Sequence, residues 1–327
     1  MNIVGIDIGG TKCAAVLGEQ TADGRIAVID KTVFSTEVEK GFNHSLHKIF
    51  AGIDETLARH GIAPGRLGGM GISCGGPLDA RQGLIMSPPN LLGWDNVPIV
   101  ALLEERFGVK TRLQNDANAC ALAEWRYGAG RGCRNMIFLT FGTGLGAGMI
   151  LNGRLYSGAN DMAGEVGHIR LAEWGPVGYG KAGSFEGFCS GGGIAQLARV
   201  KVLEKLQAGE KVSFCAGVEA LNDLTAKTVS DAAHAGDELA REIYRICGHF
   251  LGKGLAVLID ILNPERIVIG SIFARSQDLI SESMQAAIEA ESLSHAAKVC
   301  RVVPAGLGEA IGDYAALAVA LYETERE

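Results

Sequence analysis

The chain has 327 residues, of which 47% are apolar and 20% are charged, enough for two packed domains of ordinary size. Its formal net charge of −7 argues against a general affinity for nucleic acid or for a membrane, because both attract basic surfaces. No apolar run reaches the roughly 20 residues of a membrane-spanning helix, and the N-terminus lacks the pattern of a secretory signal. We therefore expect a cytoplasmic protein whose scattered cysteines are reduced.

The first predicted element is a β-hairpin in the segment IVGIDIGGTKCAAVL. Two apolar runs, Ile3 to Ile8 and Lys12 to Leu17, flank a glycine turn. Asp7 lies in the first run, where a buried and unpaired carboxylate would cost several kcal/mol. Asp7 must therefore be paired, with Lys12 as the obvious partner, or protonated, or exposed at a strand end, or facing a cation such as Mg²⁺.

Helices and short strands alternate along the rest of the chain. This alternation is typical of the α/β class. A domain boundary is expected near Asp116, because a second hairpin begins shortly after it. The predicted helices cover residues 43–60, 118–127, 227–261 and 309–322, and the predicted strands cover 70–73, 110–113 and 266–270.

Two polar segments in the first part of the chain are candidates for chemistry. Asn90 lies in SPPNLLGW, which is otherwise an ordinary proline-rich loop. Asn115 and Asp116 lie where a short strand leads into a helix. Asp116 is therefore either a simple helix cap or a general base that the helix N-terminus keeps ionised.

The second predicted hairpin covers residues 136–151, MIFLTFGTGLGAGMIL. Neither glycine turn matches a known phosphate loop in full. GIDIGGTK has Thr before Lys and a strand where the loop should be, and GTGLGAG leads into an apolar strand rather than the helix of a dinucleotide-binding motif. Each is either a plain hairpin turn or a turn whose successive N–H groups converge on an anion, and two such turns could clamp a polyphosphate.

Two further segments follow the second hairpin. Glu165 and His168 lie three residues apart in GEVGHIR, where they could grip a polyol by bidentate hydrogen bonds. The alternative for His168 is a structural histidine. Glu186 lies in SFEGFCSGG and could equally belong to the first turn of a helix.

The ordered set of segments resembles the ROK family of repressors, open reading frames and sugar kinases, within the actin-like ATPase superfamily. The resemblance implies two actin-like (ribonuclease H-like) α/β domains with ATP and a sugar in the cleft between them. The N-terminal lobe would be 1–116, joined by a C-terminal helix at about 309–327, and the C-terminal lobe would be 117–308. The matching segments are DIGGTK, GISCGGPLD, SPPNLLGW, QNDANA, TFGTGLGAG, GEVGH, ERIVIGS and LGEAIGDYAAL.

The resemblance also implies an activity, the ATP-dependent phosphorylation of a hydroxyl, most often O6, of a hexose or N-acetylhexosamine. Asp116 would be the catalytic base, Mg²⁺ would lie beside Asp7 through water, and the protein would be a homodimer without nucleic-acid or membrane partners. The implied sugar contacts are Gly76, Asn90, Asn115, Asp116, Glu165, His168 and Glu186. The implied ATP contacts are Asp7, Gly9, Gly10, Thr11, Lys12, Gly142, Thr143 and Gly144, with Gly270 near the adenosine.

One segment departs from the family pattern. Family kinases commonly carry three cysteines after GH that bind zinc together with the histidine, whereas this chain has VGYGKAGSFE. Val177, Tyr179 and Ser184 stand where the thiolates would be, so we expect no zinc. We expect Tyr179 and Phe185 to hold this loop by packing.

Three other functions were weighed against a kinase. A repressor of this family needs a DNA-binding helix-turn-helix before the sugar domain, and no such segment precedes the first hairpin in this sequence. A sugar-binding sensor or regulator without catalysis needs neither Asp7 nor Asp116. A dehydrogenase is disfavoured by the failed dinucleotide motif, and the sequence does not identify the sugar.

Overall fold

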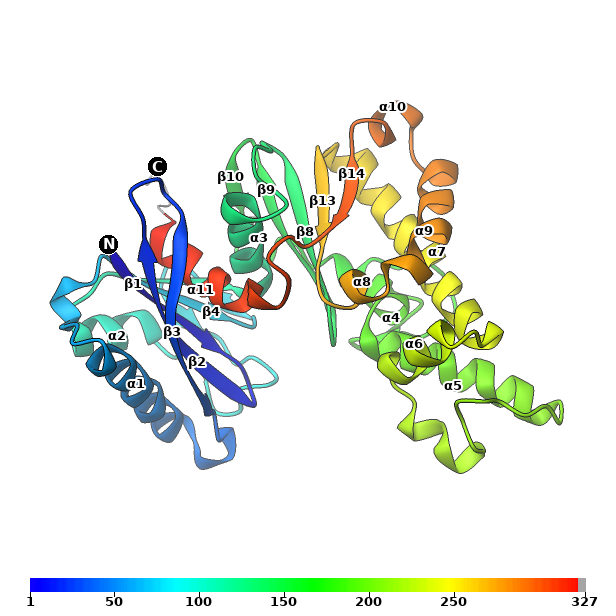
Figure 1. Cartoon of the computed structure of the whole chain (residues 1–327), viewed down its shortest axis with the longest axis horizontal. Coiled ribbons are helices and arrows are strands. Elements are labelled where there is room, and N and C mark those ends of the chain that lie inside the picture. Colours follow the sequence, from blue (N-terminus) through cyan, green and yellow to red (C-terminus); the bar gives the residue numbers. More distant parts are fainter. Residues whose placement is uncertain (323–327) are drawn as a thin grey trace. The chain divides into compact units, whose positions relative to one another are not determined.

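The computed structural model describes residues 1–322 and divides the chain into two compact units (Figure 1). The first unit comprises residues 1–133, 148–163 and the chain from residue 306. The second comprises residues 134–147 and 164–305. The predicted α/β class is confirmed, because each unit combines strands with packed helices.

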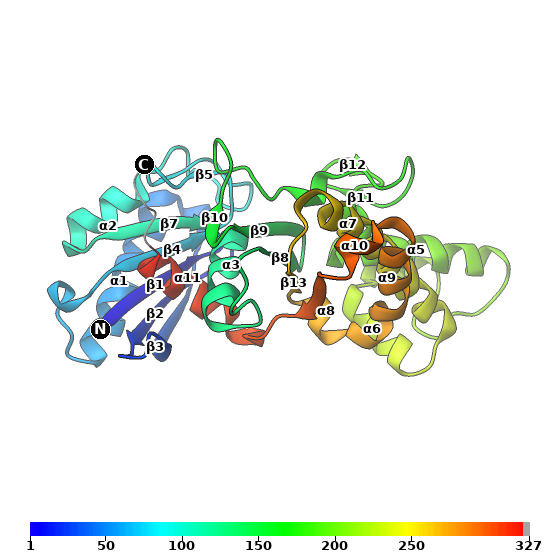
Figure 2. The same ribbon diagram turned by 90° about the horizontal axis from the view of Figure 1, so that it is seen from above.

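The first unit is built on a five-stranded sheet of order β3-β2-β1-β4-β7, which Figure 2 shows from above. The expected first hairpin is confirmed as β1 and β2, and Asp7 lies opposite Ala14 on β2 and Ser73 on β4. The strands β1, β4 and β7 are parallel, so their carboxyl ends lie at one edge. The strands are β1 (Asn2–Ile8), β2 (Lys12–Gln20), β3 (Ile26–Ser35), β4 (Met70–Cys74) and β7 (Thr111–Asn115).

Helices cover both faces of this sheet. On one face, Ile49 of α1 (Phe42–Arg59) and Leu103 of α2 (Ile99–Phe107) are fully buried in a core with Ile6. On the other face, α11 (Ile311–Leu321) comes close because Gly71 has no side chain. A Cβ at Gly71 would lie 2.3 Å from the Ala316 carbonyl oxygen. The helix α3 (Asp116–Tyr127) packs against α11.

Short elements complete the first unit. These are the strands β5 (Leu78–Asp79), β6 (Leu84–Ile85) and β10 (Arg154–Tyr156), and the 3-10 turns η1 (Val38–Lys40), η2 (Pro64–Arg66) and η5 (Gly308–Ala310).

A second five-stranded sheet has the order β10-β9-β8-β13-β14. The expected second hairpin is confirmed, because β8 and β9 are neighbours in this sheet and join at the second glycine turn. The strand β13 is parallel to both β8 and β14. The strands are β8 (Met136–Phe141), β9 (Leu145–Leu151), β13 (Arg266–Ile269) and β14 (Arg301–Pro304).

The remaining elements of the second unit are mostly helical, and they differ from expectation at one point. The single helix expected over residues 227–261 is two helices, because Gly236 has a φ of +100° and ends the first of them. The Asp237 side chain then accepts a hydrogen bond from the Ala240 N–H at 3.0 Å and caps the next helix. The elements are η3 (Val166–His168), β11 (Val177–Gly178), β12 (Lys181–Ala182), α4 (Phe185–Phe188), α5 (Gly191–Gln207), η4 (Val218–Asp223), α6 (Ala226–His234), α7 (Glu238–Leu262), α8 (Ile272–Arg275), α9 (Gln277–Glu291) and α10 (Ser294–Ala297).

Candidate active site

The first glycine turn joins β1 to β2. Thr36, which follows β3, holds it from one side: its hydroxyl donates to the Gly9 carbonyl oxygen at 2.6 Å, and its N–H donates to the Thr11 carbonyl oxygen at 3.0 Å. Within residues 1–322, the N–H groups of Gly10 and Thr11 have no acceptor. Adjacent unpaired N–H groups at a tight turn suit an anion. Sequence reasoning missed Thr36, since its link to the turn arises only when β3 pairs with β2.

Four of the predicted residues of the first unit lie close together at the carboxyl edge of its sheet. The backbone of Asn90 lies against Gly10, where a Cβ would be 2.3 Å from the Asn90 carbonyl oxygen. Gly76 follows β4 and precedes a cis proline, and a Cβ on it would lie 3.2 Å from Nδ2 of Asn115. The carboxyl edge of parallel strands is where α/β proteins bind ligands.

Asn115 and Asp116 both contact the first turn of α3. Asn115 is the N-cap of α3, and its Oδ1 accepts a hydrogen bond from the Ala117 N–H at 2.9 Å. Asp116 is the first residue of the helix, with an exposed side chain whose Oδ1 also accepts from the Ala117 N–H, at 2.8 Å. The helix therefore does not depend on Asp116 alone for its cap.

Asp7 lies near the end of β1, in surroundings that disfavour its charge. Burial is the main cause that raises the pKa of Asp7 to about 6, and the negative charges of Asp116 and Asp313 add to it. Lys31 lowers this pKa more than Lys12 does, so the expectation of Lys12 as the main partner is wrong. Lys31 forms an ion pair with Asp313.

This excess of negative charge fits a divalent cation. A Cβ on Gly312 would lie 3.8 Å from Oδ2 of Asp7, which places the start of α11 beside the carboxylate. Among residues 1–322 no three His, Cys, Asp or Glu side chains converge on one metal position. Mg²⁺ usually takes one or two carboxylates and completes its shell with water and substrate phosphates, so Asp7 suits that mode.

The second glycine turn joins β8 to β9 and has different supports. The Gly142 N–H donates to the Gly144 carbonyl oxygen at 3.1 Å, and the Gly142 carbonyl oxygen accepts from the Gly191 N–H at 2.8 Å. In the described part of the chain, the N–H groups of Thr143 and Gly144 have no acceptor. Each of the two turns therefore presents two adjacent N–H donors that have no acceptor among the described residues.

Glu186 lies directly against this second turn. It belongs to the first turn of α4, whose cap is Ser184, as the structural alternative predicted. Its Oε2 accepts a hydrogen bond from the Leu145 N–H at 3.0 Å, and a Cβ on Gly144 would lie 2.8 Å from that oxygen. Sequence reasoning missed this contact, because the two segments are far apart along the chain.

Glu165 precedes the short turn η3 and His168 ends it, next to Glu186. Gly167 lies between them, and a Cβ there would be 3.2 Å from the Glu186 Cβ. Glu165 is exposed and His168 is half-buried. The structure thus brings the three predicted sugar contacts of the second unit into one neighbourhood, while Gly270 lies separately at the end of β13, buried against Phe138.

The segment that departs from the family pattern forms a small hairpin, β11 and β12. Phe185, which follows it, is fully buried, as expected. Tyr179 is 74% exposed, so the expectation that it packs into the loop is wrong. It lies at the tip of the hairpin with a φ of +44°. Among the described residues its ring pairs with the His168 ring, in a T-shaped arrangement with centroids 5.2 Å apart.

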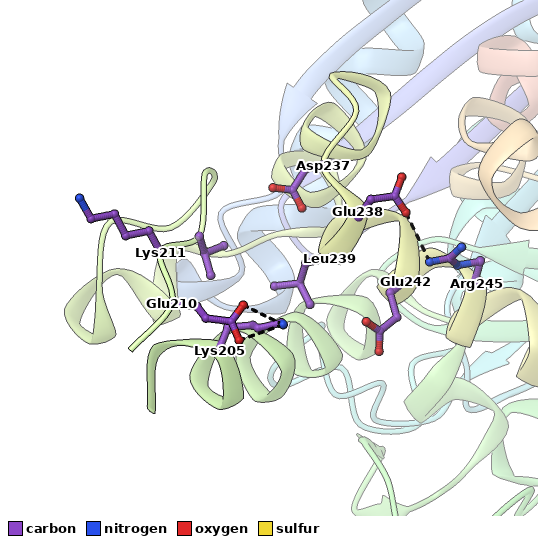
Figure 3. Close-up of a pocket in the computed structure, with 9 residues that line it drawn as sticks. Lys205, Glu210, Lys211, Asp237, Glu238, Leu239, Glu242 and Arg245 are labelled. Atoms are coloured by element: carbon purple, nitrogen blue, oxygen red, sulfur yellow. Dashed lines mark hydrogen bonds and ion pairs between the residues drawn. The ribbon is translucent and has the colours of Figure 1, made fainter. Parts of the chain in front are cut away.

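A pocket of about 350 Å³ in the second unit has no part in this site (Figure 3). Two ion pairs lie among its lining residues: Lys205 pairs with Glu210, and Arg245 pairs with Glu238. None of the predicted site residues lines it. Its lining is Lys205, Glu210, Lys211, Val212, Asp237, Glu238, Leu239, Glu242 and Arg245.

Comparisons of the sequence with known proteins match it to one family of proteins and to individual relatives. The model of the ROK family matches residues 3–323. A glucokinase of Halalkalibacterium halodurans is 33% identical over 94% of this chain and 92% of its own length. The DNA-binding transcriptional dual regulator NagC of Escherichia coli is 33% identical over 67% of this chain and 52% of its own.

The fold is also found among solved structures. A glucokinase of Streptomyces griseus in complex with glucose and AMPPNP superposes with a TM-score of 0.77 at 27% identity, covering 98% of this chain and 99% of the other.

Among residues 1–322, no helix is both long enough and apolar enough to cross a membrane.

Proposed function

The chain belongs to the ROK family and is a sugar kinase of that family, and we propose that it transfers the γ-phosphoryl group of ATP to a hydroxyl, most often O6, of a hexose or N-acetylhexosamine. The observation that carries this proposal is the arrangement at the carboxyl edge of the first sheet. There, unpaired N–H groups of the first turn, the half-buried Asp7 and the exposed Asp116 belong to one unit.

In this proposal, Asp116 is the general base. The sugar oxygen forms a bond to the γ-phosphorus, the bond from that phosphorus to the bridging oxygen breaks, and ADP leaves. The hydroxyl proton goes to the Asp116 carboxylate. The exposed side chain of Asp116 and the separate cap provided by Asn115 support this role.

The two glycine turns are proposed to bind the phosphates of the same nucleotide. Each presents two adjacent N–H groups without an acceptor in the described chain, at Gly10 and Thr11 and at Thr143 and Gly144. Gly9, Lys12 and Gly142 complete the turns, and Gly270 is proposed to lie near the adenosine. Asp7 would hold Mg²⁺ through water, and the ion when bound would neutralise charge on the phosphate oxygens.

The sugar is proposed to contact residues of both units. Glu165, His168 and Glu186 offer carboxylate and imidazole groups that suit vicinal hydroxyls. The contiguity of these three side chains supports the assignment. From the first unit, Gly76, Asn90, Asn115 and Asp116 would contribute.

The test is an ADP-release assay with ATP and Mg²⁺ over a panel of glucose, mannose, fructose, allose and their N-acetylated relatives. We expect saturable turnover with at least one sugar and a product that carries phosphate on O6 by ³¹P and ¹³C NMR. Turnover with no member of the panel, in protein that is folded by circular dichroism, would overturn the proposal.

A regulator without catalysis is the second candidate, and the similarity to NagC is the observation that favours it. Such a protein would bind the sugar without consuming ATP. Calorimetric sugar binding combined with no ADP release would identify it. Asp116 and Asp7 argue for the kinase, since binding alone requires neither a base nor a metal-binding carboxylate.

We further propose that the protein is cytoplasmic, as its use of ATP and a small sugar suggests, and that it is a homodimer, as the resemblance to the ROK family implies. Light scattering coupled to size-exclusion chromatography checks the state of association. A mass near 34.3 kDa would contradict the dimer, since that is the mass of one chain.

A further inference from the structure

The hairpin of β11 and β12 carries a residue that its turn does not favour. Tyr179 and Gly180 form the two-residue loop, with φ values of +44° and +77°. Loops with two positive φ values favour Asn, Asp and Gly, because a Cβ crowds the backbone there. An aromatic side chain at the first position is therefore strained.

Burial does not compensate for this strain. The Tyr179 side chain is 74% exposed, so it gains little from the removal of apolar surface from water. Its one ring partner within the described chain is the imidazole of His168, at 5.2 Å between centroids and 74° between planes. A strained residue without a packing reward points to a functional contact.

The same hairpin holds the backbone next to His168. Nζ of Lys181 donates to the His168 carbonyl oxygen at 2.7 Å. The imidazole of His168 is thus contacted by the tip of the hairpin, and its main chain by the following strand. Tyr179 and Lys181, both in this hairpin, therefore contact the ring and the main chain of His168.

The hairpin also packs on Glu186 and on helix α5. A Cβ on Gly178 would lie 2.8 Å from the Glu186 Cβ, so the strand and α4 are in close contact. Gln196 of α5 pairs with both main-chain groups of Val177, since its Oε1 accepts from the Val177 N–H at 2.9 Å and its Nε2 donates to the Val177 carbonyl oxygen at 2.9 Å. The base of the hairpin is therefore anchored while its tip contacts His168.

We propose that the hairpin of residues 177–182 positions the sugar-contacting side chains His168 and Glu186, and that Tyr179 is the positioning residue that sets the orientation of the His168 ring. This inference rests on the proposed function of the site as a sugar-binding one. Tyr179 acts through His168 rather than on the reacting atoms.

The test compares Tyr179→Ala, Tyr179→Gly and Tyr179→Phe with the wild-type protein. The alanine and glycine variants both remove the ring, and glycine also removes the backbone strain. The phenylalanine variant keeps the ring contact. Tyr156→Ala is the matched control, because it removes a tyrosine ring that is 50% exposed on β10, outside the hairpin and the proposed site.

We expect the KM for the sugar to rise by roughly 3- to 10-fold in the alanine and glycine variants, the range expected for loss of one aromatic pair. The KM for ATP and kcat should change by less than about twofold. The phenylalanine variant and the control should behave like wild type. Equal increases of both KM values, or an unchanged sugar KM in both ring-less variants, would overturn the proposal.

A second readout does not depend on activity. In ¹H–¹³C NMR spectra of the sugar-free protein, the ring protons of His168, assigned by their loss in His168→Gln, should shift in Tyr179→Ala and remain in Tyr179→Phe. An unchanged His168 signal would overturn the positioning role even if the wild-type protein phosphorylates sugars. A shifted signal in a protein that phosphorylates no sugar would support the contact and overturn only the proposed function.

Discussion

The two glycine turns each present two adjacent N–H groups without an acceptor in the described chain, but they have different neighbours. The first turn is held by the hydroxyl of Thr36. It lies in the unit that contains Asp7 and Asp116, whose negative charges repel each other. The second turn is held by the N–H of Gly191 and by the carboxylate of Glu186, which accepts a main-chain hydrogen bond. The motif therefore sets which N–H groups are offered to an anion, whereas the neighbours decide what other chemistry is available there.

The largest effect is expected at Asp116, and it tests whether chemistry belongs to the first unit. Asp116→Ala should lower kcat by about 10²- to 10⁴-fold, because it removes the general base. The sugar Kd from calorimetry should stay within a few-fold of wild type. Asp54→Asn, which removes an exposed carboxylate paired with Arg106 at the surface, is the control and should leave both values unchanged. Near-normal turnover in Asp116→Ala would remove this residue from the mechanism.

A matched pair of glycine substitutions compares the space around the two turns. Gly10→Ala places a Cβ 2.3 Å from the Asn90 carbonyl oxygen, whereas the nearest atom to a Cβ on Gly142 is Oγ of Ser271 at 3.9 Å. We expect Gly10→Ala to lower the free energy of unfolding by about 1–3 kcal/mol and Gly142→Ala to change it by less than about 0.5 kcal/mol. Urea unfolding measures both, and equal losses would show that the turns are equally confined.

The titration of Asp7 tests the charge balance beside the first turn. Its pKa is raised from 3.8 to about 6, so this group contributes stability below pH 4 that is lost as the pH rises through 6. In metal-free buffer, Asp7→Asn should therefore raise the free energy of unfolding at pH 8 by about 1–3 kcal/mol, and the gain should disappear below pH 4. A constant difference between pH 4 and pH 8 would contradict the raised pKa.

The smallest effect concerns the support of the first turn. Thr36→Val removes the hydroxyl that donates to Gly9 and should cost about 1 kcal/mol of unfolding free energy, with an increase of a few-fold in the KM for ATP. Thr36→Ser keeps the hydroxyl and is the control. If valine and serine behave alike, the hydroxyl does not support the turn.

Local patterns in the sequence were sufficient to predict both hairpins and the helices α1, α3 and α11, whereas α2, α5 and α9 were not predicted. The runs that flank each glycine turn are rich in apolar residues, as buried strands are, and the Asn115–Asp116 pair marks a helix start. The break between α6 and α7 was also readable in principle, since Gly236 followed by Asp237 combines a helix end with a cap. Apolar periodicity on both sides obscured it.

Contacts between distant segments could not be predicted in this way. Asp313 comes close to Asp7 only because α11 packs on the sheet, where Gly5 and Gly71 leave room for it, and Lys31 does so because β3 pairs with β2. Glu186 reaches the second turn only through the fold of the second unit. The sequence pattern therefore identified residue types suited to chemistry, while the charge state of Asp7 and the role of Tyr179 required the three-dimensional arrangement.

A crystal structure with AMPPNP, Mg²⁺ and the sugar that gives the highest kcat/KM tests the central claim most directly. The account predicts phosphate oxygens within hydrogen-bond distance of the N–H groups of Gly10, Thr11, Thr143 and Gly144. It also predicts a sugar hydroxyl within about 3.2 Å of the Asp116 carboxylate. A nucleotide bound by one turn alone, or a sugar whose hydroxyls all lie beyond the reach of Asp116, would contradict it.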